Sequence, residues 1–130
     1  MKLITRDTDY AARAVCFISK QKGRLVSASE LVDELKVPYP FLRKQLQLLS
    51  RSGILKSYKG KGGGFQLGKP AGKIYLTDLI KVFQGDFALN ECLLKKKICP
   101  ARGTCVLRKK ILGIEKYVVD QLGLVTIADL

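Results

Sequence analysis

A short run of glycine and lysine, Gly60-Lys61-Gly62-Gly63-Gly64, lies between two segments with the composition of β-strands. Residues 54–59 precede it, and Phe65-Gln66-Leu67 follows with apolar and polar residues in alternation. Glycine adopts backbone conformations that other residues avoid, so such a run is typical of a hairpin tip. The sequence therefore predicts a β-hairpin over residues 54–67, which restricts the chain to folds that combine helices with a small wing.

Three short amphipathic helices are predicted before this hairpin. The first spans residues 8–21, where apolar residues recur every three or four positions. The second follows a capping box of Ser27 and Glu30, in which the hydroxyl and the carboxylate satisfy backbone N–H groups of the first turn. The third begins near Pro40 and ends at Gly53. Short helices with tight connections and a hairpin directly after them predict a mainly α winged helix-turn-helix.

The second half of the chain is predicted to hold two further helices. Ile74-Tyr75-Leu76 is interpreted as a short strand, after which Thr77 caps a fourth helix that Gly85 closes. A long helix follows from residue 104 or 105 to about residue 122, and residues 126–129 form a final turn. The domain prediction is a winged helix-turn-helix over 1–85, a cysteine loop over 86–104, and a dimerisation helix with a C-terminal turn over 105–130.

The long helix carries apolar residues at the spacing of a coiled-coil seam. Successive positions lie four, three and four residues apart, at Leu107, Ile111, Ile114 and Val118. A seam this narrow favours pairing with a second copy of the chain over packing on its own domain, although the second arrangement is also compatible with the pattern. A homodimer would suit a reader of palindromic DNA.

The charge of the chain is concentrated in its first part. The formal net charge is +13, and residues 1–73 hold 15 basic and 5 acidic side chains, a balance of +10. No acidic residue occurs between Glu34 and Asp78. A basic stretch of this kind predicts a polyanionic partner, here double-stranded DNA. No signal peptide is visible and no apolar run approaches the length of a membrane span, so a cytoplasmic location is expected. A membrane surface is not an expected partner, because no amphipathic basic helix with an exposed apolar face is left to bind it.

Candidate DNA-binding residues lie on the third helix and on the hairpin tip. Arg43 and Gln47 are of the types that bind guanine and adenine edges in the major groove, and Lys44 and Arg51 suit phosphates. Phe41 either contacts DNA or packs against the first helix. Lys59 and Lys61 suit the minor groove or nearby phosphates. The full predicted set is Tyr39, Pro40, Phe41, Arg43, Lys44, Gln47, Arg51, Lys59, Lys61 and Gly62.

Three cysteines form a second candidate site. Cys92, Cys99 and Cys105 have the spacing Cys-x6-Cys-x5-Cys beside several cations, which favour the thiolate form. Thiolates bind zinc or an iron–sulfur cluster, and they also support redox chemistry without metal; the spacing alone leaves these three alternatives open. The chain has no histidine, so no catalytic histidine exists, and no nucleophile–base pair is apparent. We therefore expect a protein that is not an enzyme.

The chain resembles the dimeric winged-helix repressors that include the iron–sulfur assembly regulator IscR, the nitric-oxide sensor NsrR and the iron-responsive RirA. The resemblance rests on Thr8-Asp9-Tyr10-Ala11, on residues 61–67, on the three cysteines and on the closing residues 126–130. It implies a transcriptional repressor that holds an iron–sulfur cluster, more plausibly 4Fe–4S than 2Fe–2S, on Cys92, Cys99 and Cys105. It also implies that nitric oxide, redox state or iron status changes operator affinity through this cluster.

The fourth cluster ligand is where the sequence departs from part of this family. The iron–sulfur assembly branch uses a histidine after the third cysteine, and this chain has none. The nitric-oxide branch uses an N-terminal aspartate, which matches Asp9; Asp9 is equally plausible as the N-cap of the first helix. Asp7 and Glu91 are weaker candidates. The alternatives to a cluster regulator are a DNA-binding protein that uses zinc or thiol redox and a small iron–sulfur electron carrier.

Overall fold

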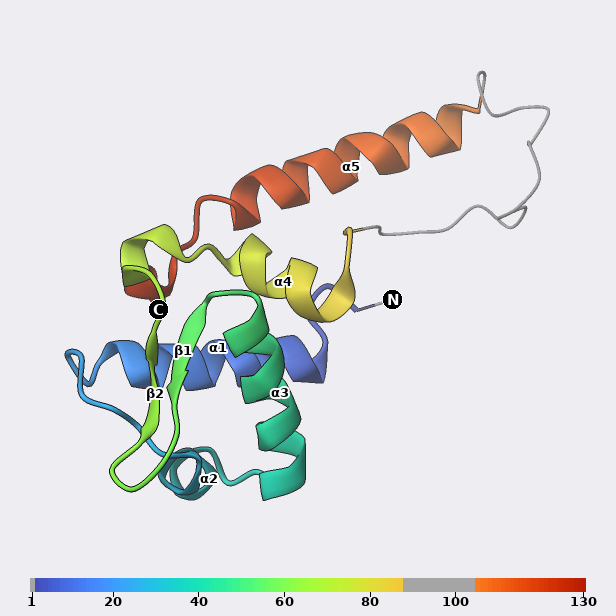
Figure 1. The fold of residues 1–130 in the computed structure, drawn as a ribbon. Coiled ribbons are helices and arrows are strands. Elements are labelled where there is room, and N and C mark those ends of the chain that lie inside the picture. Colours follow the sequence, from blue (N-terminus) through green and yellow to red (C-terminus); the bar gives the residue numbers. More distant parts are fainter. Residues whose placement is uncertain (1, 88–104) are drawn as a thin grey trace.

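The computed structural model describes residues 2–87 and 105–130. Within these ranges the fold is mostly helical with one antiparallel two-stranded hairpin, as the sequence predicts (Figure 1). The elements are α1 (Arg6–Ser19), α2 (Ala28–Leu35), α3 (Tyr39–Arg51), β1 (Leu55–Tyr58), β2 (Gly64–Leu67), η1 (Ala71–Lys73), α4 (Leu76–Gln84), α5 (Val106–Leu122) and η2 (Ile127–Asp129).

Helix α1 lies at the centre of the packed part of the molecule. It contacts α2, α3, α4, β2 and η2. Its inward positions follow the spacing seen in the sequence, because every third or fourth residue of a helix returns to the same face. The buried apolar residues form one cluster: Ala11, Ala14, Val15, Ile18, Val26, Leu31, Val37, Leu42, Leu46, Leu49, Ile54, Leu55, Ile74, Leu76, Leu79, Ile80 and Ile127.

The starts of α1 and α2 differ in detail from the predicted caps. Thr5 is the N-cap of α1, and its hydroxyl accepts a hydrogen bond from the Thr8 N–H at 3.4 Å. Asp9 therefore lies within the helix and is not its cap. The Ser27 hydroxyl accepts from the Glu30 N–H at 3.1 Å, as a capping box requires. The Glu30 carboxylate, however, binds Arg24 instead of the backbone of Ser27.

The predicted hairpin is confirmed, with Leu55 opposite Leu67 and Tyr58 opposite Gly64. Glycine is needed at positions 63 and 64, where the chain enters β2, because the backbone of other residues lies very close. A Cβ atom at Gly63 would lie 2.2 Å from the Tyr58 carbonyl oxygen, and one at Gly64 would lie 2.7 Å from that of Val26. No side chain fits at these distances, so the glycine run sets the path of β2.

The segment before α4 is not the predicted strand. Tyr75 makes an isolated antiparallel bridge with Thr126 of the C-terminal segment. Helix α4 begins at Leu76, one residue before the predicted cap Thr77, and its N-cap is Tyr75. The Tyr75 N–H donates to the Asp78 carboxylate at 2.9 Å, which satisfies the helix start without the Thr77 hydroxyl. The predicted closure at Gly85 is confirmed, with a positive φ of 73°.

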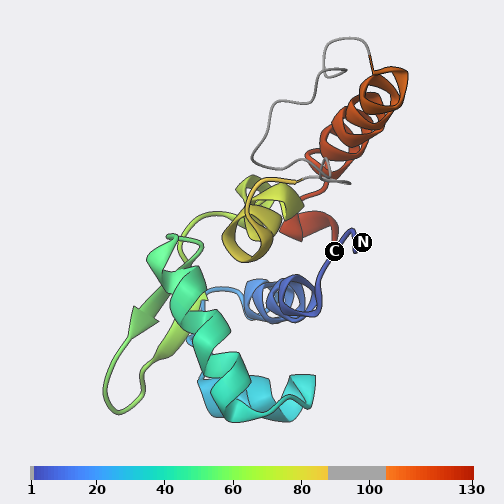
Figure 2. The same cartoon turned by 90° about the vertical axis from the view of Figure 1, so that its right-hand side faces the viewer.

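Helix α5 extends away from the packed part of the molecule (Figure 2). It begins after the N-cap Cys105, as predicted, and contains no buried residue. Its C-terminal end approaches α4, where Leu122 packs against the core cluster. The chain then turns back, and η2 packs against α1 and η1.

Candidate nucleic-acid interface

Helix α3 has one buried face and one charged face. Leu42, Leu46 and Leu49 are at most 1 % exposed and anchor the helix in the core. Gln45 lies on the same inner face and is 3 % exposed. On the outer face, every predicted polar DNA-binding residue is exposed to solvent: Arg43, Lys44, Gln47 and Arg51. Because the leucines fix which face of α3 points inward, the four polar side chains on the opposite face are exposed and able to contact bases and phosphates.

The start of α3 divides its aromatic residues between surface and interior. Tyr39 is 48 % exposed, and Pro40 is exposed beside it. The Phe41 ring is half-buried and packs edge-to-face on Tyr10 of α1, with ring centroids 5.8 Å apart. The Arg6 guanidinium lies 5.9 Å from the Phe41 ring centroid and 5.5 Å from that of Tyr10. Phe41 thus makes the contact with α1 that the sequence offered as an alternative to DNA contact.

The tip of the hairpin carries exposed cations. Lys59 and Lys61 are both exposed, and Gly60 and Gly62 have φ values of 93° and 79°, which place them in a conformation that glycine accommodates without strain. Gly62 is exposed as well, so the backbone at the tip is open to a partner. The two lysines are well placed to reach a polyanion.

The backbone just before α2 pairs with the second strand of the hairpin, β2. The Phe65 N–H donates to the Val26 carbonyl at 2.8 Å, and the Val26 N–H donates to the Phe65 carbonyl at 2.9 Å. Val26 directly precedes Ser27, the N-cap of α2. The position of the hairpin relative to α2 is therefore set by paired main-chain hydrogen bonds.

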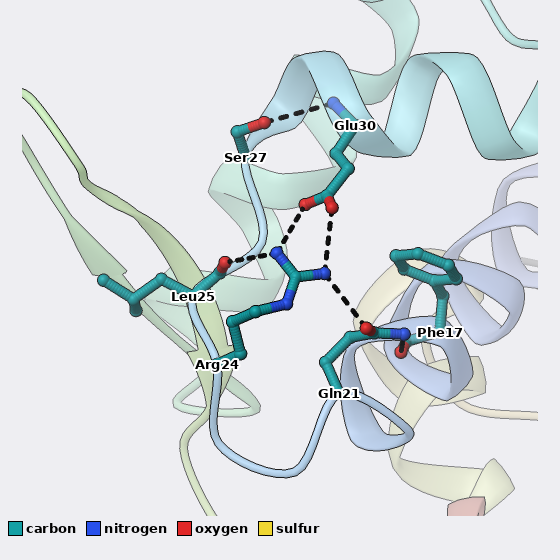
Figure 3. Close-up of polar contacts among 6 residues, drawn as sticks. All are labelled: Phe17, Gln21, Arg24, Leu25, Ser27 and Glu30. Atoms are coloured by element: carbon teal, nitrogen blue, oxygen red, sulfur yellow. Dashed lines mark hydrogen bonds and ion pairs between the residues drawn. The ribbon is translucent and has the colours of Figure 1, made fainter.

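A polar cluster fixes the turn between α1 and α2 (Figure 3). The two terminal nitrogens of Arg24 each bind one carboxylate oxygen of Glu30, at 3.2 and 2.8 Å. The same guanidinium donates to the Gln21 side chain at 3.0 Å and to the Leu25 carbonyl at 3.3 Å. The hydrogen bond from Arg24 holds the pKa of the Glu30 carboxyl below its usual value, and Glu30 raises the pKa of Arg24.

Two residues of the hairpin surface were not among the sequence candidates. Tyr58 is 45 % exposed, and its hydroxyl accepts a hydrogen bond from the Gln66 side chain at 2.8 Å. Lys56 is exposed on β1, on the same strand as Tyr58. Side chains two residues apart in a strand point to the same face, and this spacing is the signal that could have identified Lys56 together with Tyr58.

Only part of the predicted cluster site lies in the described ranges. Cys105 is half-buried at the N-terminus of α5, and Asp9 is exposed on α1, where its carboxylate binds Arg13 at 3.1 Å. Asp7 is also exposed. Cys92, Cys99 and Glu91 lie outside the described residues, within which no group of three metal-binding side chains occurs.

The predicted seam of α5 is partly open to solvent in the single chain. Leu107 is 68 % and Ile114 is 54 % exposed, whereas Ile111 and Val118 are half-buried. Val106 and Tyr117, which the seam prediction did not include, are 68 % and 66 % exposed. Among the described helices, none is both long and apolar enough to cross a membrane.

Comparison with known proteins places this arrangement among DNA-binding regulators. The family model Rrf2, described as an iron-dependent transcriptional regulator, matches residues 4–130. One relative, from Aquifex aeolicus (strain VF5), is described as an HTH-type transcriptional regulator. It is 33 % identical over 123 residues, and the match covers 93 % of this chain and 85 % of the relative. Protein aau3 of Rhizobium meliloti (strain 1021) is 32 % identical over 128 residues, covering 92 % and 83 % of the two chains.

Solved structures share the same fold. The structure of CymR (YrzC), described as the global cysteine regulator of B. subtilis, superposes with a TM-score of 0.82 at 24 % identity and covers 99 % of this chain and 95 % of that one. IscR of T. potens gives a TM-score of 0.76 at 21 % identity, with 99 % and 85 % covered. At these identities the likeness concerns the fold alone.

Proposed function

Because the chain belongs to the Rrf2 family of helix-turn-helix transcriptional regulators, we propose that it represses transcription as a homodimer that reads a palindromic operator through α3 and the β1–β2 hairpin. The observation that carries this proposal is the two-faced construction of α3, with buried leucines on one side and Arg43, Lys44, Gln47 and Arg51 exposed on the other. A helix of this kind presents its outer side chains to base edges in the major groove.

The hairpin supplies the second contact. Lys59 and Lys61 lie at an exposed tip whose position relative to α2 is fixed by the Val26–Phe65 bridge. The sequence between Glu34 and Asp78 contains no acidic residue that would repel phosphate near this surface. Cations at the tip strengthen binding to DNA, because they displace counterions from the phosphates. This contribution is independent of base sequence.

A binding experiment separates these two roles. A duplex selected by the protein from a random library is compared with a random duplex of equal length. Arg43→Ala should weaken binding to the selected duplex by ~1–3 kcal/mol with less effect on random DNA, because a bidentate base contact is lost. Lys59→Ala should weaken binding to both duplexes alike and reduce the salt slope by about 0.9. Equal losses on both duplexes for Arg43→Ala would remove its base-reading role.

The dimer proposal rests on α5. In the single chain this helix buries no residue and leaves Leu107 and Ile114 largely exposed. A soluble protein seldom leaves a row of large apolar side chains in water unless another surface covers them. A second copy of α5 would cover this row and bring two α3 helices into one assembly. Solved relatives share the fold that includes α5, at 99 % coverage of this chain.

We further propose that Cys92, Cys99 and Cys105 hold an iron–sulfur cluster, with Asp9 of the partner subunit as the fourth ligand. Three thiolates and one carboxylate form a donor set that suits iron, and the carboxylate would make the weakest bond. When bound, the cluster would supply sensitivity to redox state and nitric oxide. Asp9 is exposed, and within residues 2–87 and 105–130 its carboxylate binds only an exposed partner, Arg13, so the aspartate is accessible to an incoming ligand.

An anaerobic preparation tests the cofactor. Stoichiometric iron and sulfide with visible absorption would support the cluster, whereas colourless protein with stoichiometric zinc would contradict it. Asp9→Ala should shorten the lifetime of the cluster while DNA binding by the metal-free protein stays unchanged. Arg13→Ala is the matched variant, because it frees the Asp9 carboxylate without removing it; it should preserve the cluster. A thiol sensor without metal is the second candidate, because Cys105 and the two other cysteines could act through thiol chemistry alone.

A further inference from the structure

One glutamine at the end of α4 binds the first turn of α1. The Gln84 side-chain oxygen accepts hydrogen bonds from the Thr5 N–H at 3.0 Å and from the Thr8 hydroxyl at 2.7 Å. Its amide nitrogen donates to the Leu3 carbonyl at 3.3 Å. Thr8 is fully buried, so its hydroxyl has no solvent available as a substitute partner. Residues 76 to 81 positions apart in the sequence are thus held together through one amide group.

A second glutamine binds the same turn of α1 from α3. The Gln45 amide nitrogen donates to the Asp7 carbonyl at 3.2 Å, and Gln45 is 3 % exposed. Its side-chain oxygen has no hydrogen-bond partner among the described residues. In the sequence Gln45 stands two residues after Arg43 and two before Gln47, both exposed on the outer face of α3. A shift of the backbone at Gln45 therefore moves these two side chains as well.

The first turn of α1 is consequently shared between α4 and α3. Gln84 binds it from one helix and Gln45 from the other, and the Arg6 side chain adds a contact to Phe41 at the start of α3. The N–H groups of a first turn have no partners within their own helix, so a side chain from elsewhere can satisfy one of them, as Gln84 does for Thr5. The first turn of α1 therefore links α4 to α3 through side-chain contacts on both sides.

We propose that Gln84 and Gln45 are positioning residues for DNA recognition: through the first turn of α1, they set the placement of the base-reading face of α3 relative to α4. The inference rests on the proposed function, because it concerns how α3 is presented to DNA. Neither glutamine touches DNA. Both act by holding the backbone of α1, so their loss should change discrimination between DNA sequences more than general affinity for DNA.

The test is a double-mutant cycle in the full chain. Gln84→Met and Gln45→Met keep side-chain length and remove the hydrogen bonds. Each should lower affinity for the selected duplex by about tenfold and leave affinity for random DNA within about twofold. The double variant should lose no more than the weaker-binding single variant, because both substitutions interrupt one route. Losses that multiply in the double variant would show that the two residues act separately and would overturn the proposal.

Three further variants guard against a merely structural effect. Gln84→Glu keeps the oxygen that accepts from Thr5 and Thr8 but loses the donor to Leu3, so it should recover most of the discrimination that Gln84→Met loses. Thr8→Val removes, at nearly constant volume, the hydroxyl that bonds Gln84 and the Thr5 hydroxyl, and it leaves the other two hydrogen bonds of Gln84 in place. It therefore provides a milder test should Gln84→Met not fold. Gln21→Met is the matched control, because Gln21 donates to the Phe17 carbonyl at the other end of α1. An equal loss of discrimination for Gln21→Met would contradict the proposed route.

Failure of the inference can be told apart from failure of the proposed function. If the unaltered chain does not prefer its selected duplex to random DNA, the proposed function is wrong. The positioning role is wrong if the unaltered chain discriminates and three variants discriminate equally well: Gln84→Met, Gln45→Met and Thr8→Val. Thermal denaturation must first show that each of these variants is folded.

Discussion

The winged helix-turn-helix and α5 solve the problem of burying apolar surface in different ways. In the first region, helices and hairpin close around α1, and the core side chains Leu42, Leu49 and Leu79 are fully buried. Helix α5 is 17 residues long, the longest described element, yet it buries none of its residues. In proteins most of the stability of a helix comes from packing of its apolar face against other elements. The contrast indicates that one region folds on its own contacts and the other depends on a further surface.

The largest expected effect comes from opening the core of the first region. Leu49→Ala should lower the free energy of unfolding by ~2–5 kcal/mol, because a fully buried leucine is replaced by a cavity. Val106→Ala on α5 is the matched truncation at a side chain that is 68 % exposed, and it should change stability by no more than ~0.5 kcal/mol. Denaturant unfolding at fixed protein concentration measures both. Similar losses for the two variants would break the contrast between the regions.

The second effect concerns the surface that α5 needs. Ile114→Asp should raise the dissociation constant of the dimer by about 100-fold or more, since a charge would be buried in the proposed seam. Lys116→Asp introduces the same side chain at an exposed position outside the seam and should leave the dimer intact. Sedimentation equilibrium measures the association state. If Ile114→Asp remained as dimeric as the unaltered chain, α5 would not form the seam proposed here.

Glycine substitutions sharpen the comparison further. A Cβ atom at Gly68, after β2, would lie 2.1 Å from the Gly53 carbonyl oxygen, so Gly68→Ala should destabilise the chain by ~1–3 kcal/mol. A Cβ atom at Gly113 in α5 would have no neighbour within 4 Å, and alanine favours helix. Gly113→Ala should therefore stabilise the chain by ~0.5–1 kcal/mol. Thermal denaturation checks both signs; destabilisation by Gly113→Ala would place this residue against a partner.

The smallest effect is a pH dependence in the α1–α2 turn. Because the folded pKa of Glu30 lies below its ordinary value of 4.5, the ionised carboxylate stabilises the fold above that pH. This contribution is lost as the pH falls through the lowered folded pKa. Glu30→Gln should reduce the melting temperature slightly at neutral pH, and the difference from the unaltered chain should disappear in acid. A difference that persisted at low pH would mean that Glu30 acts through packing and not through its charge.

Local patterns allowed most of the fold to be predicted. The helices of the first region and the hairpin were recognisable because apolar spacing and glycine act within a few residues of each other. The bridges from Val26 to Phe65 and from Tyr75 to Thr126 join distant segments, and single positions of this kind leave no periodic signal. For the same reason Ile74-Tyr75-Leu76 was wrongly predicted as a strand: its residues suit one, but its partner is a single residue.

The candidate site divides along the same line. The outer face of α3 was predictable, since its charged residues alternate with an apolar stripe that fixes which side faces inward. The roles of Gln84 and Gln45 were not, because a buried amide has no characteristic spacing and its partners are backbone groups elsewhere in the chain. The Glu30 carboxylate binds Arg24 and not the backbone at the start of α2. This pairing depends on how the loop between α1 and α2 folds, so it was not predictable either.

The Val26–Phe65 bridge has a consequence for the thermodynamics of binding. A two-stranded hairpin alone is marginally ordered in water, and a partner would then have to freeze it on contact. Ordering the backbone costs on the order of 1–2 kcal/mol for each residue at 25 °C. Because two further main-chain hydrogen bonds join the hairpin to the residue before α2, this conformational entropy is lost during folding. Complex formation should accordingly show a smaller unfavourable entropy than it would with a free hairpin.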